Sequence, residues 1–220
     1  MAEPVVLVSG AAGGIGGATA RRFAASGWRV VATDRDTAGL ARLAEDLGPA
    51  LAAAVTADLL RVQECRAAVE ATIAATGRLD CLVNAAGLWT ERTGGSIVDL
   101  SSDAGLQGNA GAAVYCASKG AVSNLTRALA LELAPRGIRV HAVCQADVET
   151  PMLRYQAETF GGGDPEGYRR RLWENYPQGA RARFLRPEEV ADLIFYLAQA
   201  LAAGITGANV SIDFGLSAGI

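Results

Sequence analysis

The sequence has little of what a metal centre or a nucleic-acid interface requires. His141 is its one histidine, and Cys65, Cys81, Cys116 and Cys144 lie far apart with no Cys-x-x-Cys pair, which argues against a zinc cluster. The 20 basic residues are outnumbered by 23 acidic ones, for a formal net charge of -3, so no positive excess is available to hold a phosphate backbone. We therefore expect no bound metal and no nucleic-acid partner.

Long apolar runs are also missing. No stretch approaches the ~18 apolar residues that a membrane span requires, and no charged and then apolar leader follows Met1. We expect a cytoplasmic protein with reduced cysteines and no membrane association. What the 220 residues do contain is 50% apolar side chains against 20% charged ones, a balance that excludes disorder and favours one large globular domain over residues 1–220.

The order of the apolar segments predicts an α/β fold. Runs typical of strands buried on both faces alternate with segments of helical periodicity. Strands are expected at residues 5–8, 29–33, 53–57, 81–84, 96–100, 139–144 and 208–212, and helices at 16–26, 37–47, 113–133 and 187–202. A further helix is expected to bury the apolar series Val62, Cys65, Val69 and Ile73. This alternation predicts a doubly wound parallel sheet, the Rossmann fold, with residues 153–186 as a lid-like insertion.

A glycine-rich turn joins the first expected strand to the first expected helix. Gly10, Gly13, Gly14 and Gly16 lie there with Ile15, in the spacing Gly-x-x-x-Gly-x-Gly. Such a turn presents backbone N–H groups and a helix N-terminus to a pyrophosphate, which side chains would block. A purely structural turn is the alternative reading.

Asp34 ends the second expected strand, about twenty residues after the glycines. A carboxylate there accepts hydrogen bonds from the adenosine ribose of NAD and repels the 2′-phosphate of NADP. NAD is therefore the expected cofactor and NADP the less favoured one, although the neighbouring Arg35 is able to receive that phosphate. A turn or capping role for Asp34 is the alternative.

Tyr115 and Lys119 are one helical turn apart and share a helix face. A nearby ammonium favours the anion of a phenol and lowers its pKa, so the tyrosine can exchange a proton with an alcohol or carbonyl oxygen. Ser102, just past the fifth expected strand, would hydrogen-bond the same oxygen. An exposed helical pair without function is the alternative for an isolated Tyr-x-x-x-Lys.

Together with Asn84-Ala85-Ala86-Gly87 and a serine thirteen residues before the tyrosine, these motifs resemble those of the short-chain dehydrogenase/reductase family, single-domain type, over nearly the whole chain. The resemblance implies Ser102, Tyr115 and Lys119 as catalytic residues. It implies that the cofactor is bound by Gly10, Gly14, Ile15, Gly16, Asp34, Asp58, Asn84, Ala85, Gly87, Tyr115, Lys119, Val148 and Thr150. For Asp58 and for Thr150, which precedes Pro151, helix capping is a competing or additional role.

The chain departs from that family in two places. Only residues 87–95 separate the fourth and fifth expected strands, too few for a crossover helix, and they contain no asparagine to complete the family's proton relay. We expect apolar sheet surface to be bare there, in a shortened variant or in a sequence that lacks a segment. Gln145-Ala146 also replaces the family's Pro-Gly beside the nicotinamide.

The expected activity is NAD-dependent interconversion of a secondary alcohol and a ketone on a small molecule. The alternative is a catalytically silent nucleotide-binding or interaction protein of the same fold. The lid arginines, 169–171, 181, 183 and 186, could attract an acidic substrate or simply form a solvated face. Small and apolar residues along the helix at 113–133 predict a homodimer, with a tetramer as the second possibility: Ala117, Ala121, Leu125 and Ala128.

Overall fold

The computed structural model describes residues 3–85 and 95–218. Strands and helices alternate along the chain, as the apolar pattern predicts. The strands are β1 (Val5–Ser9), β2 (Arg29–Asp34), β3 (Leu51–Thr56), β4 (Cys81–Asn84), β5 (Gly95–Leu100), β6 (Ile138–Gln145) and β7 (Ala208–Ile212). The α-helices are α1 (Gly14–Ala24), α2 (Thr37–Leu47), α3 (Val62–Thr76), α4 (Ala113–Leu133), α5 (Pro151–Phe160), α6 (Pro165–Trp173) and α7 (Pro187–Ala198).

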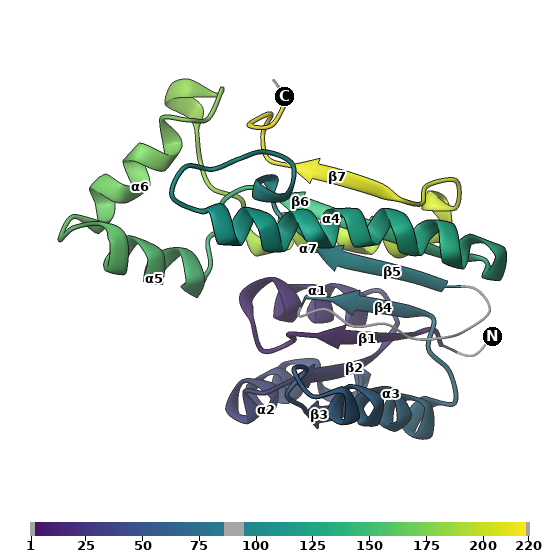
Figure 1. Ribbon diagram of the computed structural model, residues 1–220. Coiled ribbons are helices and arrows are strands. Elements are labelled where there is room, and N and C mark those ends of the chain that lie inside the picture. The colour runs from purple at the N-terminus through teal and green to yellow at the C-terminus, as the bar shows by residue number, and fades with distance from the viewer. Residues whose placement is uncertain (1–2, 86–94, 219–220) are drawn as a thin grey trace.

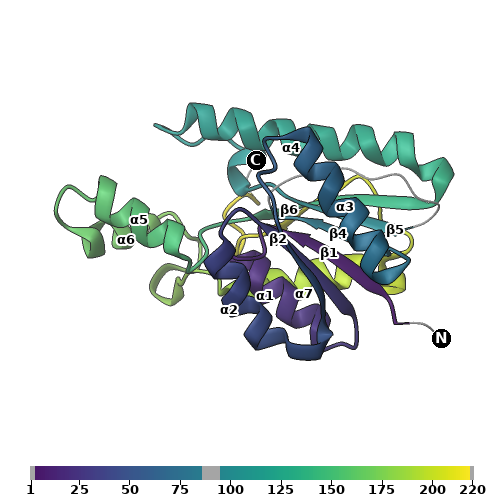
Figure 2. The same cartoon turned by 90° about the horizontal axis from the view of Figure 1, so that it is seen from below.

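The strands form one parallel sheet in the order β3-β2-β1-β4-β5-β6-β7. Helices α1, α2 and α7 cover one face, and α3 and α4 lie on the other (Figure 2). The prediction of a doubly wound Rossmann-type sheet is therefore confirmed. Because all strands run the same way, their carboxyl ends meet at one edge, where such sheets bind ligands.

The central strands are buried on both faces because they are continuous apolar runs. Val6, Val8, Val83 and Val98 are fully or almost fully inaccessible and pack in the main core with Phe23 of α1. This rigid centre holds the loops at the carboxyl edge of the sheet.

Two sequence-based expectations about the α3 and α4 face are wrong. Helix α3 buries Cys65, Ala68 and Thr72, while Val62 is 64% exposed, because small side chains let the helix approach the sheet. The sheet is also not bare around β4 and β5. Leu82 packs in a cluster with Leu79, with the partly buried Val69 of α3 and with residues of β3, and Ile97 packs against buried residues of α4. Residues 86–94, where a crossover helix was not expected to fit, lie outside the described residues.

The insertion between β6 and α7 contains α5 and α6, which extend beyond the carboxyl edge of the sheet (Figure 1). Pro151 and Pro165 each occupy a first helical turn, and the Asp164 side chain accepts a hydrogen bond from the backbone N–H of Gly167 at 2.8 Å. Within residues 3–85 and 95–218, no helix is long and apolar enough to cross a membrane. The same residues contain no cluster of three or more metal-ligating side chains.

Candidate active site

The Ser, Tyr and Lys of the sequence motif meet beside the carboxyl end of β5. Ser102 follows β5 and is the N-cap of a short 3₁₀ turn, where its hydroxyl accepts the Ala104 N–H. Tyr115 and Lys119 lie on the first turns of α4. The nearby Ser102 hydroxyl acts to lower the pKa of Tyr115. The Lys119 ammonium lies 5.8 Å from the centre of the Tyr115 ring.

The expected lowering of the Tyr115 pKa is not what this structure shows. Burial raises the pKa of the phenol above its usual value, and the carboxylates of Asp103 and Asp147 add to that effect. The Lys119 ammonium donates instead to the backbone carbonyl of Leu100 at 3.0 Å. Burial also lowers the pKa of Lys119. In its neutral form the phenol is the group that can donate a proton to a carbonyl oxygen.

The glycine-rich loop has the close backbone contacts that a pyrophosphate site needs. Gly10 has φ +68°, and a Cβ there would lie 3.2 Å from the backbone of Ala85. A Cβ at Gly16 would lie only 2.1 Å from the carbonyl oxygen of Gly10. A Cβ at Gly14 would lie 3.1 Å from the Thr150 methyl group. The loop, the end of β4 and the start of α5 therefore converge, and α1 directs its N-terminus to the same place.

Asp34 ends β2 within hydrogen-bond reach of that loop. Its carboxylate accepts the backbone N–H groups of Ala12 and Asp36, both at 3.0 Å. The turn role weighed for Asp34 is thus present, and the same bonds orient a carboxylate at the site where an adenosine ribose would lie. Arg35 is exposed. A nicotinamide dinucleotide fits this arrangement, because the glycines leave no room for side chains and the Asp34 carboxylate is held in a fixed orientation.

Asp58, Asn84 and Gly87 are three further residues that were expected to bind the cofactor. Asp58 makes a turn by accepting the Leu60 N–H at 3.1 Å, whereas the N-cap of α3 is Arg61. Asn84 donates to the buried Asp99 at 3.1 Å at the end of β4. Gly87 lies outside the described residues.

Val148 and Thr150 lie beyond β6. Val148 is buried and bridges Leu185, which ties this loop to the segment that leads into α7. Thr150 is the N-cap of α5, but its hydroxyl donates to the Val148 carbonyl at 3.2 Å rather than accepting an α5 N–H. The methyl group of Thr150 is therefore left facing Gly14 and the glycine-rich loop.

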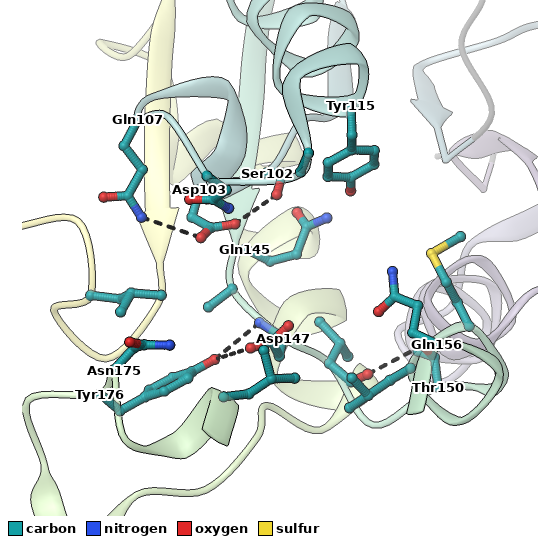
Figure 3. A pocket seen from close by; sticks show the side chains of 18 of the residues that line it. Ser102, Asp103, Gln107, Tyr115, Gln145, Asp147, Thr150, Gln156, Asn175 and Tyr176 are labelled. Atoms are coloured by element: carbon teal, nitrogen blue, oxygen red, sulfur yellow. Dashed lines mark hydrogen bonds between the residues drawn. The ribbon is translucent and has the colours of Figure 1, made fainter. Parts of the chain in front are cut away.

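A cavity of about 660 Å³ opens beside Ser102 and Tyr115 (Figure 3). The loops after β5 and β6 form one side, and α5, α6 and the residues after α6 form the other. Its polar lining includes Ser102, Asp103, Gln107, Asn109, Tyr115, Gln145, Asp147, Thr150, Gln156, Tyr168, Asn175 and Tyr176. The insertion predicted as a lid therefore lines the chamber in which the Ser and Tyr side chains lie.

Two acidic residues of this cavity were missed at the sequence level. Asp103 accepts the Ser102 hydroxyl at 2.7 Å, and Asp147 accepts the Tyr176 hydroxyl at 3.1 Å. Burial raises the pKa of Asp147 to about 6. A usable signal was present, because each acid follows closely on the carboxyl end of a strand, and β5 and β6 pair in the sheet.

The lid arginines do not enter the cavity. Arg169 forms an ion pair with Glu149 and stacks over Phe184, while Arg183 pairs with Glu189 at 2.6 Å. No arginine or lysine is among the described residues that line the cavity. The solvated and structural reading of these arginines is therefore the one the geometry favours.

Fold and site together define an α/β protein of the dinucleotide-binding class. Residues 4–94 match the family described as short chain dehydrogenase, and residues 88–217 match the family described as enoyl-(acyl carrier protein) reductase. The chain is 34% identical to meso-2,3-butanediol dehydrogenase of Serratia marcescens over 97% of its own length and 94% of that enzyme's. It is 35% identical to galactitol 2-dehydrogenase (L-tagatose-forming) of Cereibacter sphaeroides over 94% and 92%.

Solved structures agree with these sequence relatives. A variant of actinorhodin polyketide ketoreductase with NADPH superposes with a TM-score of 0.88 and 33% identity over 99% of both chains. The 3-ketoacyl-(acyl-carrier-protein) reductase from Brucella melitensis, complexed with NADH, superposes with a TM-score of 0.84 and 31% identity over 98% of this chain and 99% of that one. The chain belongs to the short-chain dehydrogenase/reductase family of nicotinamide-dependent oxidoreductases.

Proposed function

We propose that the protein interconverts a secondary alcohol and a ketone on a small molecule, with NAD as cofactor. The observation that carries this proposal is that Ser102 and Tyr115 line one cavity at the carboxyl edge of the sheet, beside the glycine-rich loop. The butanediol and galactitol dehydrogenases among the relatives support a carbinol substrate.

Each residue of the trio has a distinct role in this proposal. The nicotinamide ring, when bound, accepts or supplies a hydride. The Tyr115 phenol gives its proton to the carbonyl oxygen during reduction and takes it back during oxidation. The Ser102 hydroxyl, whose proton goes to Asp103 in this structure, would turn to donate to the same oxygen. The Lys119 ammonium, which donates to the Leu100 carbonyl here, would stabilise the phenolate that remains through its charge.

NAD is preferred over NADP in this proposal because of the Asp34 carboxylate. The backbone bonds from Ala12 and Asp36 hold that carboxylate beside the glycine-rich loop, where a 2′-phosphate would meet a like charge. The related structures carry NADPH in one case and NADH in the other, so the two cofactors need to be compared directly on this chain.

Binding and turnover test the proposal separately. NADH titrated into the protein should quench its fluorescence or enhance that of the cofactor, and a panel of secondary alcohols and ketones should then give turnover. Absence of binding at millimolar NADH and NADPH would refute the cofactor assignment. Binding without any turnover would instead favour a catalytically silent nucleotide-binding protein.

The silent alternative draws on the short connection between β4 and β5. The alignment with the Serratia enzyme runs over 248 positions, more than the 220 residues of this chain, so the relative contains residues without a counterpart here. An intact mass well above 22.7 kDa would show that the natural molecule carries a longer connection and would remove the reason for that alternative.

We propose a homodimer formed through α4. Along this helix Ala117, Ala121 and Ala128 are exposed, Leu125 is 53% exposed and Leu131 is 80% exposed. An apolar face of this length is typical of a surface that is covered by another copy of the chain. Light scattering at micromolar protein should give twice the mass of one chain, and a stable monomer would contradict the assignment.

A further inference from the structure

The cavity beside Ser102 and Tyr115 is acidic and lacks a balancing cation. Asp103 and Asp147 both line it, and no lysine or arginine does so among the described residues. Neither carboxylate forms an ion pair within residues 3–85 and 95–218. Two negative charges therefore share one chamber with the reacting groups.

Neutral donors hold both carboxylates in place. Gln107 donates to Asp103 at 3.4 Å, in addition to the Ser102 hydroxyl, and the hydroxyl of Tyr176 donates to Oδ2 of Asp147. These bonds orient the acids without cancelling their charge. Oδ1 of Asp147 receives no hydrogen bond from any described residue, so one of its acceptor positions stays available to a ligand.

The Gln145 side chain, which also lines the cavity, has an oxygen that lacks a hydrogen-bond donor. Gln145 is 9% exposed, and its Nε2 donates to the Ser101 carbonyl at 3.1 Å. Its buried Oε1 has no hydrogen-bond partner. A buried acceptor left unpaired is destabilising. In Figure 3 the Gln145 amide lies beside Ser102 and Tyr115, in the cavity that Asp103 and Asp147 also line.

We propose that the substrate carries a protonated amine close to its reacting carbon, so that it is an amino alcohol or the corresponding amino ketone. A primary ammonium has three N–H donors and no acceptor, so it suits the Asp147 oxygen that receives no hydrogen bond and the unpaired Gln145 oxygen. Its single positive charge would offset one of the two carboxylate charges. Asp103 directly follows Ser102, which places the amine within a few bonds of the carbinol. This inference rests on the proposed function and names the substrate class of the same cavity.

A matched series of secondary alcohols tests the charge directly. Isopropanolamine, propylene glycol and sec-butanol share the same carbinol and differ only in carrying an ammonium, a hydroxyl or a methyl group on the next carbon. We expect kcat/KM for isopropanolamine to exceed that for sec-butanol by about 10- to 100-fold, the range of a hydrogen bond to a charged group. Equal values for isopropanolamine and propylene glycol would overturn the assignment of a cation.

Three variants locate the effect. Asp147→Asn and Asp103→Asn each remove one charge from the cavity and should reduce the isopropanolamine to sec-butanol ratio by about tenfold or more. Glu158→Gln is the matched control, because it removes one charge from an exposed position on α5 and should leave the ratio unchanged. A ratio that responds equally in all three variants would reveal a diffuse charge effect and overturn the proposal.

Calorimetric titration of isopropanolamine into the full chain, with and without NADH, separates this inference from the proposed function. Ammonium binding that weakens in Asp147→Asn, with no turnover of any alcohol, would uphold the cation site and refute the oxidoreductase proposal for this chain. Turnover of sec-butanol with no detectable preference for isopropanolamine, in binding or in kcat/KM, would uphold the oxidoreductase and refute the cation site.

Discussion

The buried acid of the cavity should make the protein less stable than a neutral variant, and the effect should depend on pH. Burial raises the pKa of Asp147 from 3.8 to about 6. At about 1.4 kcal/mol per pKa unit, this difference corresponds to an upper bound of about 3 kcal/mol. We therefore expect Asp147→Asn to raise the free energy of unfolding at neutral pH by up to that amount.

The sign follows from proton linkage. A carboxyl whose pKa is higher in the folded state binds its proton more tightly there, so folding is favoured while the group is protonated. Below about pH 4 the carboxyl is protonated in both states, and aspartate and asparagine should then be nearly equivalent. As the pH rises through about 4 to 6, the wild type loses stability relative to the variant, and the full difference is reached near pH 7.

Urea unfolding followed by circular dichroism, at one fixed protein concentration and at several pH values, measures this difference. The asparagine amide oxygen can still accept the Tyr176 hydroxyl, so the substitution changes charge more than hydrogen bonding. Glu158→Gln, at an exposed position, should differ from the wild type by no more than about 0.5 kcal/mol. A variant at Asp147 that is no more stable at neutral pH, or whose gain is the same at low pH, would refute the reasoning.

Four further outcomes are expected. Tyr115→Phe should remove nearly all turnover while leaving NADH affinity, measured by fluorescence, little changed, because only the proton-exchanging oxygen is lost. Lys119→Ala should weaken both, since the ammonium serves the phenolate and, in the family, the nicotinamide ribose; loss of turnover with intact affinity would argue against the second contact. Asp34→Ala should narrow the ratio of kcat/KM for NAD over NADP, and a wild type that already prefers NADP would contradict the assignment. Leu125→Glu should shift light-scattering mass toward the monomer by placing a charge on the exposed face of α4.

The sheet was predictable because its strands are short, apolar and bounded by polar residues. β2 ends at Asp34 and β4 at Asn84 as the sequence indicates, and α2 and α4 have the expected ends. The helix predicted at 187–202 is longer than the observed one, because α7 ends at Ala198 and a 3₁₀ turn follows. These successes and errors have one cause: periodicity locates an apolar segment better than it locates the end of a helix.

The buried face of α3 shows where periodicity fails. Apolar side chains at helical spacing predict burial of Val62 and Ile73, yet both are substantially exposed. Thr72 is buried in their place, because its hydroxyl donates to the Ala68 carbonyl one turn earlier at 2.8 Å and so needs no other partner. A prediction from hydrophobicity alone does not include the hydrogen bond that allows a threonine hydroxyl to be buried within its own helix.

The site was predictable as far as its motif and no further. Ser102, Tyr115 and Lys119 lie as their spacing indicates, but the pKa of Tyr115 is raised mainly by burial, which spacing does not encode. The acids of the cavity follow β5 and β6, so the strand order, once known, brings them to one edge.

The charge of Asp147 has no structural role that a neutral side chain would not fill. Its hydrogen bond from Tyr176 links the loop after β6 to the lid, but an amide oxygen would accept the same donor. The backbone N–H of Asp147, which donates to the Tyr176 hydroxyl at 3.1 Å, is independent of the side chain. Groups that lower stability without serving the fold are concentrated at functional sites. Since the fold accounts for the position of this carboxylate but not for its charge, the charge is best explained by a ligand of opposite sign.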